Sequence, residues 1–188
     1  MAPALERART LFAKRIPDET ARAEATRRLT ADVEGKAVPD ADLVIEAIFE
    51  NLDAKRALYA QLLPRMKDSA LLATNTSSIG LETLAEDMAD PGRFVGLHFF
   101  NPVAQMPLVE IIQGARTRAE VAAAATAFIR KLDKLPLPCR SAFRPPPSAY
   151  TLRCHFPTAT ALYGVGAVAS SSGSVISSSP RDGPASSR

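Results

Sequence analysis

Between Leu43 and Cys139 the sequence alternates short apolar runs with amphipathic segments, and this pattern constrains the fold more than any other feature. The periodicity predicts strands at Leu43–Ile48, Leu71–Thr74, Phe94–Phe99, Leu108–Ile112 and Leu135–Cys139, and helices at Glu50–Met66, Leu81–Met88 and Thr117–Leu132. Their order along the chain is typical of an α/β fold with a doubly wound, mostly parallel sheet. We therefore expect an incomplete Rossmann-like domain.

Helix ends in this region carry recognisable capping residues. Ser78 is placed to cap the helix that begins at Leu81. Thr117 and Glu120 have capping-box spacing at the start of the last helix. Before the alternation begins, residues 4–34 predict two charged helices separated at Ile16–Asp18, where a proline ends one helix and suits the first turn of the next.

The last part of the chain differs in composition from the rest. From residue 143 to 188 the sequence is crowded with proline and serine and shows neither helical nor sustained strand periodicity, which predicts a disordered tail or, after a frameshift, a non-native one. From Leu135 onward the chain carries +4 of a total net charge of +3, so its basic character belongs to the tail and favours no nucleic-acid surface. The isolated pair Cys154 and His155 supports no metal site.

Several protein classes are disfavoured by the sequence. Two cysteines provide no disulfide framework, and a reducing compartment is the better interpretation. The first fifteen residues are charged throughout and do not resemble a secretory signal. No stretch approaches the roughly 18 apolar residues of a membrane span. We expect a cytoplasmic protein that binds neither membrane nor nucleic acid and holds no metal.

Polar side chains gather where the predicted strand Leu71–Thr74 ends. The tetrapeptide Asn75–Ser78 leaves the core there, and in α/β proteins ligands bind outside the carboxyl ends of the strands. Ser77 and His98 lie at the ends of neighbouring predicted strands, and Glu110 lies on the next strand. We therefore expect these three residues to form the centre of any site.

This trio is compatible with three interpretations. As a hydrolase triad it needs a G-x-S-x-G elbow, and Ser77 has no glycine at that spacing. In a dehydrogenase Ser77 binds the substrate oxygen, while His98, oriented by Glu110, takes a hydroxyl proton as hydride leaves. In a purely structural interpretation His98 is a core histidine bonded to a backbone carbonyl, and Ser77 caps a helix. Spacing alone favours the structural interpretation.

Three sequence runs change that balance. ADLVIEAIFENLDAKRALY, LLATNTSSI and RFVGLHFFNPVAQMPLVEII resemble the NAD-dependent 3-hydroxyacyl-CoA dehydrogenase family, most closely the dehydrogenase part of multifunctional fatty-acid oxidation proteins. The resemblance covers about residues 4–142. It implies reversible oxidation of an L-3-hydroxyacyl-CoA to the 3-ketoacyl-CoA with NAD as hydride acceptor, in fatty-acid β-oxidation in a bacterial cytoplasm.

The resemblance also implies roles for single residues. His98 matches the catalytic base, Glu110 the carboxylate that orients it, and Ser77 the serine that contacts the substrate oxygen. Asn101 matches a residue that shapes the substrate pocket. The positions that match NAD contacts or lie near the cofactor are Glu50, Lys55, Ala47 and Asn75. The helical pair at the start resembles an arm that helps to cover the acyl-CoA.

Two family motifs do not appear. The chain contains no G-x-G-x-x-G turn to hold the pyrophosphate, and the run LPLPCRSA is not followed by PGF-x-x-NR, which opens the family's helical dimerisation domain. We therefore expect residues 1–142 to form a partial NAD-binding domain without its first βαβ unit. Family members homodimerise or form oxidation complexes, but the dimerisation domain is expected to be absent here. Without the phosphate site of the first βαβ unit, we expect this chain to bind NAD weakly or not at all. The alternative is a catalytically inactive truncated fragment, at most a binding or interaction module.

Overall fold

The structure is a computed structural model that describes residues 2–141, 166–170 and 173–177. Its helices are α1 (Ala2–Arg15), α2 (Glu19–Arg27), α3 (Leu52–Leu62), α4 (Leu81–Leu84) and α5 (Ala119–Lys131). Its strands are β1 (Leu29–Ala31), β2 (Leu43–Glu46), β3 (Leu71–Thr74), β4 (Phe94–Phe99), β5 (Leu108–Gln113), β6 (Leu135–Arg140), β7 (Gly166–Ser170) and β8 (Gly173–Ser177). Single 3-10 turns occur at Val38–Asp40 (η1), Leu63–Arg65 (η2) and Pro91–Arg93 (η3).

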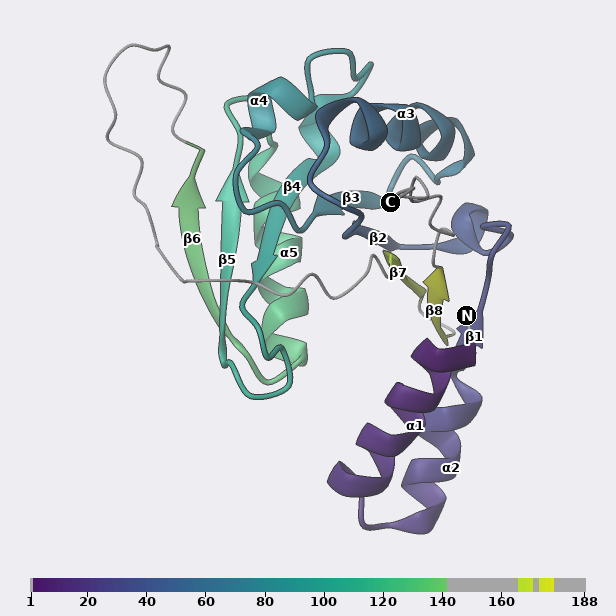
Figure 1. Ribbon diagram of the computed structural model, residues 1–188. Helices are drawn as coiled ribbons and strands as arrows, with labels where there is room; N and C mark the ends of the chain where they lie inside the picture. The colour runs from purple at the N-terminus through teal and green to yellow at the C-terminus, as the bar shows by residue number, and fades with distance from the viewer. Residues whose placement is uncertain (1, 142–165, 171–172, 178–188) are drawn as a thin grey trace, which may run out of the picture.

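Strands β2 to β6 form the sheet that the sequence predicts, in chain order (Figure 1). The pairs β2–β3, β3–β4 and β5–β6 are parallel, whereas β4 and β5 are antiparallel. The mostly parallel, Rossmann-like α/β sheet is thereby confirmed. The carboxyl ends of β2, β3 and β4 meet at one edge, which is where the Asn75–Ser78 turn leaves β3.

Helices cover both faces of this sheet, as expected for a doubly wound fold. One face packs against α3 and α4 around Tyr59, Leu72, Leu84 and Phe94. The other packs against α5, where Val121, Ala125 and Ile129 meet buried residues of β4 and β5. Because both faces are covered, the first three residues of β2 and of β3 are all apolar, whichever face of the sheet they point to.

The N-terminal helical pair projects from the sheet as an arm (Figure 1). The break between α1 and α2 lies where the proline predicts it, and Asp18 caps α2 by accepting from the Ala21 N–H at 2.7 Å. The second helix, expected from Glu19 to about Leu29, ends at Arg27, and Leu29–Ala31 forms β1, which the sequence does not predict and which continues the sheet. Pairing with a tail strand determines the conformation of these three residues, and the local sequence cannot show that pairing.

The tail contributes two strands where the sequence predicts none. β7 pairs antiparallel with β2, and β8 lies between β7 and β1. Their alternation of small and β-branched residues lasts too few positions to stand out in a serine-rich segment. The other residues of 142–188, including Cys154 and His155, lie outside the described part of the chain.

Two capping predictions are wrong. Gly80, not Ser78, is the N-cap of α4, and Arg118 is the N-cap of α5 without a side-chain bond. The Ser78 hydroxyl donates to Glu50, and the Thr117 hydroxyl donates to the Phe94 carbonyl oxygen at 2.7 Å. In both cases an acceptor distant in sequence takes the hydroxyl that a local cap would have used. No helix among the described residues is long and apolar enough to cross a bilayer.

Gly96 makes a close contact that sets the spacing of β4 and β5. A Cβ added there would lie 2.8 Å from Ile112 Cβ, an atom fixed by the backbone of the partner strand. We expect Gly96→Ala to lower the free energy of unfolding by about 1–3 kcal/mol, because the strands must separate. Gly80→Ala is the control, since its added Cβ meets nothing closer than 3.8 Å. Urea denaturation should show a control effect below about 1 kcal/mol, and equal effects would contradict this account.

Candidate active site

His98 and Glu110 face each other across the antiparallel pair β4–β5. The two residues are direct partners in the register, and His98 Nδ1 lies 2.8 Å from Glu110 Oε2. A carboxylate accepts hydrogen bonds, so Nδ1 carries the proton and Nε2 is left with a free lone pair. Both side chains remain about one-fifth exposed. His98 is thus oriented as a base that a ligand can reach.

Ser77 completes the trio from the turn after β3. Its Oγ lies 3.3 Å from His98 Nε2, the nitrogen that Glu110 does not engage. The His98 ring also packs against Phe100, with ring centroids 4.6 Å apart. The structure therefore brings together the three residues that the sequence places at its centre, and a hydroxyl bound near Ser77 Oγ would have a proton acceptor beside it.

Glu50 organises the turn that carries Ser77. Its Oε1 accepts from Thr76 Oγ1 at 2.5 Å, from the Ser77 N–H at 2.9 Å, and from both the N–H and the hydroxyl of Ser78 at 3.0 Å. One carboxylate oxygen thus collects donors from three consecutive residues. The conformation of this turn depends on a side chain that lies 27 positions before Ser77 in the sequence.

The pKa of Glu50 is lowered by this arrangement. Burial alone would raise it, but the hydrogen bonds from Thr76, Ser78 and Ser77 and the positive charge of Lys55 outweigh burial. The group therefore stays ionised under conditions in which an ordinary carboxyl begins to take up protons.

A second carboxylate, Glu46, lies behind Glu50 in a buried polar cluster. Lys55 Nζ donates to Glu46 Oε1 at 2.7 Å, and both side chains have no exposed surface. Tyr59 and Thr74 donate to the other oxygen of Glu46. The pKa of Tyr59 is raised by burial and by the charge of Glu46. Sequence reasoning missed Glu46, although its position inside the apolar run Leu43–Ile48 is a signal that could have marked it as a buried carboxylate.

The remaining predicted site residues lie at the same edge of the sheet. Asn75 Oδ1 accepts from the Phe99 N–H at 2.8 Å, which ties the end of β3 to the end of β4. Ala47 is half-buried directly after β2, and Asn101 is exposed two residues after β4. Only Lys55 of this set is enclosed by other side chains. The cofactor and substrate contacts of these residues stay predictions.

The geometry weakens both alternatives to a dehydrogenase. A hydrolase needs free N–H groups beside its serine to stabilise an oxyanion, yet the Ser77 and Ser78 N–H groups donate to the Glu50 carboxylate. A core histidine would be bonded to a backbone carbonyl, whereas His98 is partly exposed and pairs with Glu110. Ser77 caps no helix, because α4 begins after Gly80.

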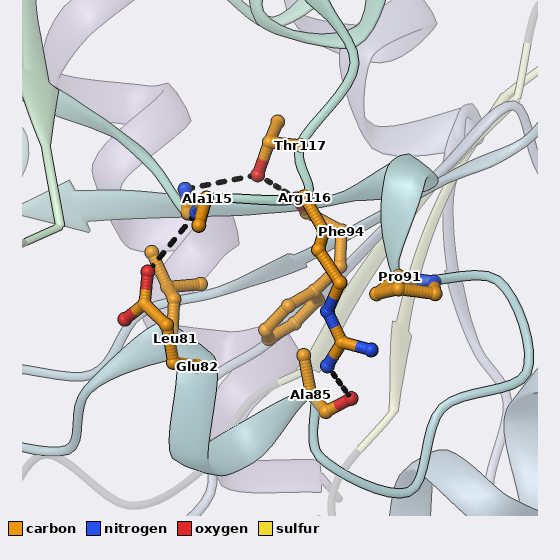
Figure 2. A pocket seen from close by; sticks show the side chains of 9 residues that line it. Leu81, Glu82, Ala85, Pro91, Phe94, Ala115, Arg116 and Thr117 are labelled. Carbon is orange, nitrogen blue, oxygen red and sulfur yellow. Dashed lines mark hydrogen bonds between the residues drawn. The ribbon is translucent and has the colours of Figure 1, made fainter. Parts of the chain in front are cut away.

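A different hollow lies at the start of β4, four residues before His98. Figure 2 shows Glu82 accepting from the Ala115 N–H and Arg116 donating to the Ala85 carbonyl oxygen around it. The cavity measures about 10 Å³, which at most admits a water molecule. These hydrogen bonds connect α4 and the residue after it to the segment between β5 and α5. We therefore interpret the hollow as a packing feature and not as a ligand site.

The described residues offer neither a metal-binding cluster nor a phosphate-binding turn. Among the described residues no group of three or more histidine, cysteine or acidic side chains could hold a metal ion. Residues 164–169 read GVGAVA, a G-x-G-x-x-A spacing that sequence reasoning missed. That spacing holds a pyrophosphate where it opens a helix, whereas Gly166–Ala169 lie inside β7. The context required of a phosphate-binding turn is therefore not met.

Comparison with known proteins gives a consistent result. The sequence model of the 3-hydroxyacyl-CoA dehydrogenase NAD binding domain matches residues 3–142. The fatty acid oxidation complex subunit alpha of Psychrobacter arcticus is 45% identical over 98 residues, which cover 52% of this chain and 14% of that protein. The corresponding subunit of Idiomarina loihiensis is 41% identical over 109 residues, covering 58% of this chain and 15% of that protein. The chain thus matches about one-seventh of the length of these relatives.

Solved structures agree with the sequence comparison. The 3-hydroxybutyryl-CoA dehydrogenase of Escherichia coli is 37% identical with a TM-score of 0.67, over 74% of this chain and 30% of that chain. The (S)-3-hydroxybutyryl-CoA dehydrogenase PaaH1 of Ralstonia eutropha is 35% identical with a TM-score of 0.67, over 75% of this chain and 49% of that chain.

The lowered pKa of Glu50 makes its contribution to stability depend on pH. Because the folded pKa lies below the ordinary value of 4.5, the stabilisation is present above pH 4.5 and is lost as the pH falls through the folded pKa. We expect Glu50→Gln to lower the free energy of unfolding at pH 7. The difference from wild type should shrink as the pH falls below 4.5. Urea denaturation at several pH values measures this, and a difference independent of pH would refute it.

Proposed function

The chain belongs to the 3-hydroxyacyl-CoA dehydrogenase family, and from that premise we propose that it carries the proton-transfer residues for the family's reaction. The reaction is the reversible oxidation of an L-3-hydroxyacyl-CoA to the 3-ketoacyl-CoA in fatty-acid β-oxidation, with NAD as the cofactor. The observation that supports it best is the placement of His98 between Glu110 at 2.8 Å and Ser77 at 3.3 Å.

Each member of the trio has one task in this proposal. The Ser77 hydroxyl bonds the substrate oxygen and holds it beside His98. Nε2 of His98 then takes the hydroxyl proton, and the Glu110 carboxylate stabilises the imidazolium that forms. NAD, when bound, supplies the hydride acceptor. In the reverse direction the imidazolium returns its proton to the carbonyl oxygen.

The residues present fit one part of NAD. Glu50 Oε2 lies 3.5 Å from Lys55 Nζ, and the side chain of Glu50 is 35% exposed. It can therefore accept a hydrogen bond from a ribose hydroxyl, and Asn75 and Ala47 lie at the same edge of the sheet. Lys55 is enclosed, so we propose that it acts on the cofactor site through Glu50. No G-x-G-x-x-G turn appears in the sequence to hold the pyrophosphate.

The charged groove of the helical arm is an argument for an acyl-CoA substrate. A groove of about 600 Å³ runs between α1 and α2, and its charged lining consists of Arg9, Arg22, Arg27 and Glu19. Arg9 and Arg27 also pair with Glu6 and Glu24 of their own helices. Arginine side chains suit the phosphate groups of coenzyme A. We assign Asn101 to the rim of the acyl pocket, since it is exposed just beyond His98 in the chain.

We assign residues 1–142 to a partial NAD-binding domain, to whose sheet residues 166–170 and 173–177 of the tail add β7 and β8. The curated relatives are subunits of fatty acid oxidation complexes, which supports a similar complex, and a bacterial cytoplasm, for the whole protein. The alternative that this chain is a catalytically inactive fragment makes a different prediction in the assay below.

Replacing the base tests the proposal directly. We expect His98→Ala to lower reduction of acetoacetyl-CoA by about 10²- to 10⁴-fold, because a general acid-base step is lost. The rate is measured by incubating the protein with acetoacetyl-CoA and millimolar NADH and quantifying the product, 3-hydroxybutyryl-CoA, by chromatography. His155→Ala is the matched control, since the chain has two histidines. Equal rates in both variants would contradict the role of His98, and no turnover in any of the proteins would favour the inactive fragment.

The cofactor affinity of the chain is a separate prediction. Without a glycine-rich turn to hold the pyrophosphate, we expect NADH to bind with a Kd well above micromolar. Isothermal titration of the purified chain with NADH measures it. A micromolar Kd would show that other residues of the chain hold the phosphates.

A further inference from the structure

Glu46 is a buried carboxylate whose hydrogen-bonding capacity is filled. One oxygen accepts from Lys55 Nζ at 2.7 Å and from the Ile48 N–H at 2.6 Å. The other accepts from Tyr59 at 2.7 Å and from Thr74 at 2.8 Å. A carboxylate offers about four such positions, so Glu46 is fully satisfied and its place at the end of β2 is fixed.

Lys55 connects Glu46 to the site. Its ammonium group has three donors, and three oxygens surround it: Glu46 Oε1 at 2.7 Å, the Ile48 carbonyl oxygen at 3.4 Å and Glu50 Oε2 at 3.5 Å. The side chain has no exposed surface, so this charge is weakly screened by water. Lys55 therefore attracts Glu50 from a position that Glu46 defines.

Glu50 connects Lys55 to the turn formed by residues 76–78. While one of its oxygens faces Lys55, the other collects donors from Thr76, Ser77 and Ser78. Ser77 is exposed, and its N–H bond to Glu50 links it to the buried cluster. The 3.3 Å approach of its hydroxyl to His98 depends on where this turn lies.

The contribution of the buried Glu46–Lys55 ion pair to stability does not by itself explain why the protein has it. A buried ion pair can often be replaced by apolar or neutral groups of similar volume without loss of stability, whereas removal of one partner leaves a costly unpaired charge. We infer that the Glu46–Lys55 pair positions Ser77: it fixes Glu50, and Glu50 holds residues 76–78 so that the Ser77 hydroxyl meets His98. This inference deepens the proposed function and rests on it for the importance of Ser77.

The experiment uses the full chain and a double variant that keeps the core neutral. Glu46→Gln combined with Lys55→Met removes both buried charges, so neither is left unpaired. Glu50→Ala removes the carboxylate that accepts hydrogen bonds from residues 76–78. Lys67→Met is the matched control, because Lys67 forms a partly exposed pair with Asp42 at the other end of β2.

The main measurement is amide hydrogen exchange of Ser77 and Ser78 by NMR. We expect exchange at least tenfold faster in the double variant and in Glu50→Ala, with α5 amides unchanged. Ser78 should respond less, because its N–H also lies 3.4 Å from Thr76 Oγ1. The Lys67→Met variant should match wild type. Unchanged exchange in the double variant would overturn the role of the pair, and unchanged exchange in Glu50→Ala would overturn the role of Glu50.

The exchange measurement is independent of turnover, so it separates this inference from the proposed function. Where wild type reduces acetoacetyl-CoA, the double variant should lower kcat at saturating NADH by at least tenfold while the KM for acetoacetyl-CoA changes less than twofold. A merely structural pair would change the unfolding transition but leave kcat per folded molecule intact. An inactive wild type would count against the proposed function, and the exchange data would still decide the inference.

Discussion

The antiparallel pairing of β4 with β5 is the constraint on which the site depends. β2, β3 and β4 run in parallel and deliver their carboxyl ends to one edge, but β5 runs the other way and begins at that edge. Glu110, near the start of β5, therefore lies opposite His98, near the end of β4. A shift of one residue would turn Glu110 to the other face and leave His98 without its orienting partner. Gly96 permits this register, because a Cβ at its position would lie only 2.8 Å from Ile112 Cβ on the paired strand.

The sequence shows most of the fold because the strands are buried on both faces. Each of the five predicted strands from Leu43 to Cys139 exists within one or two residues of its expected ends. The proximity of Ser77, His98 and Glu110 is also predictable from the strand ends, whereas their interpretation as a catalytic trio needed the family resemblance. These features depend on patterns that are local in sequence and on the general rule that ligands bind at the carboxyl edge.

The parts that the sequence does not show depend on distant partners. β1 forms because a tail strand pairs with it, and Ser78 and Thr117 do not cap helices because Glu50 and the Phe94 carbonyl take their hydroxyls. Lys55 looks like a surface residue in a charged helix, yet it is enclosed between two carboxylates. No periodicity separates a lysine that pairs inside the core from one that faces water.

The charges around the trio determine which chemistry it can perform. Glu50 approaches Ser77 from one side and Glu110 contacts His98 from the other. A developing oxyanion beside Ser77 would face a carboxylate where acyl transfer needs N–H donors, so its formation would be disfavoured. A proton arriving on His98 creates a cation beside Glu110, which is favoured. In a hydroxyl oxidation the carbon product is neutral and the positive charge rests on the base. The same three side chains that suggest a hydrolase triad therefore favour removal of a proton together with a hydride.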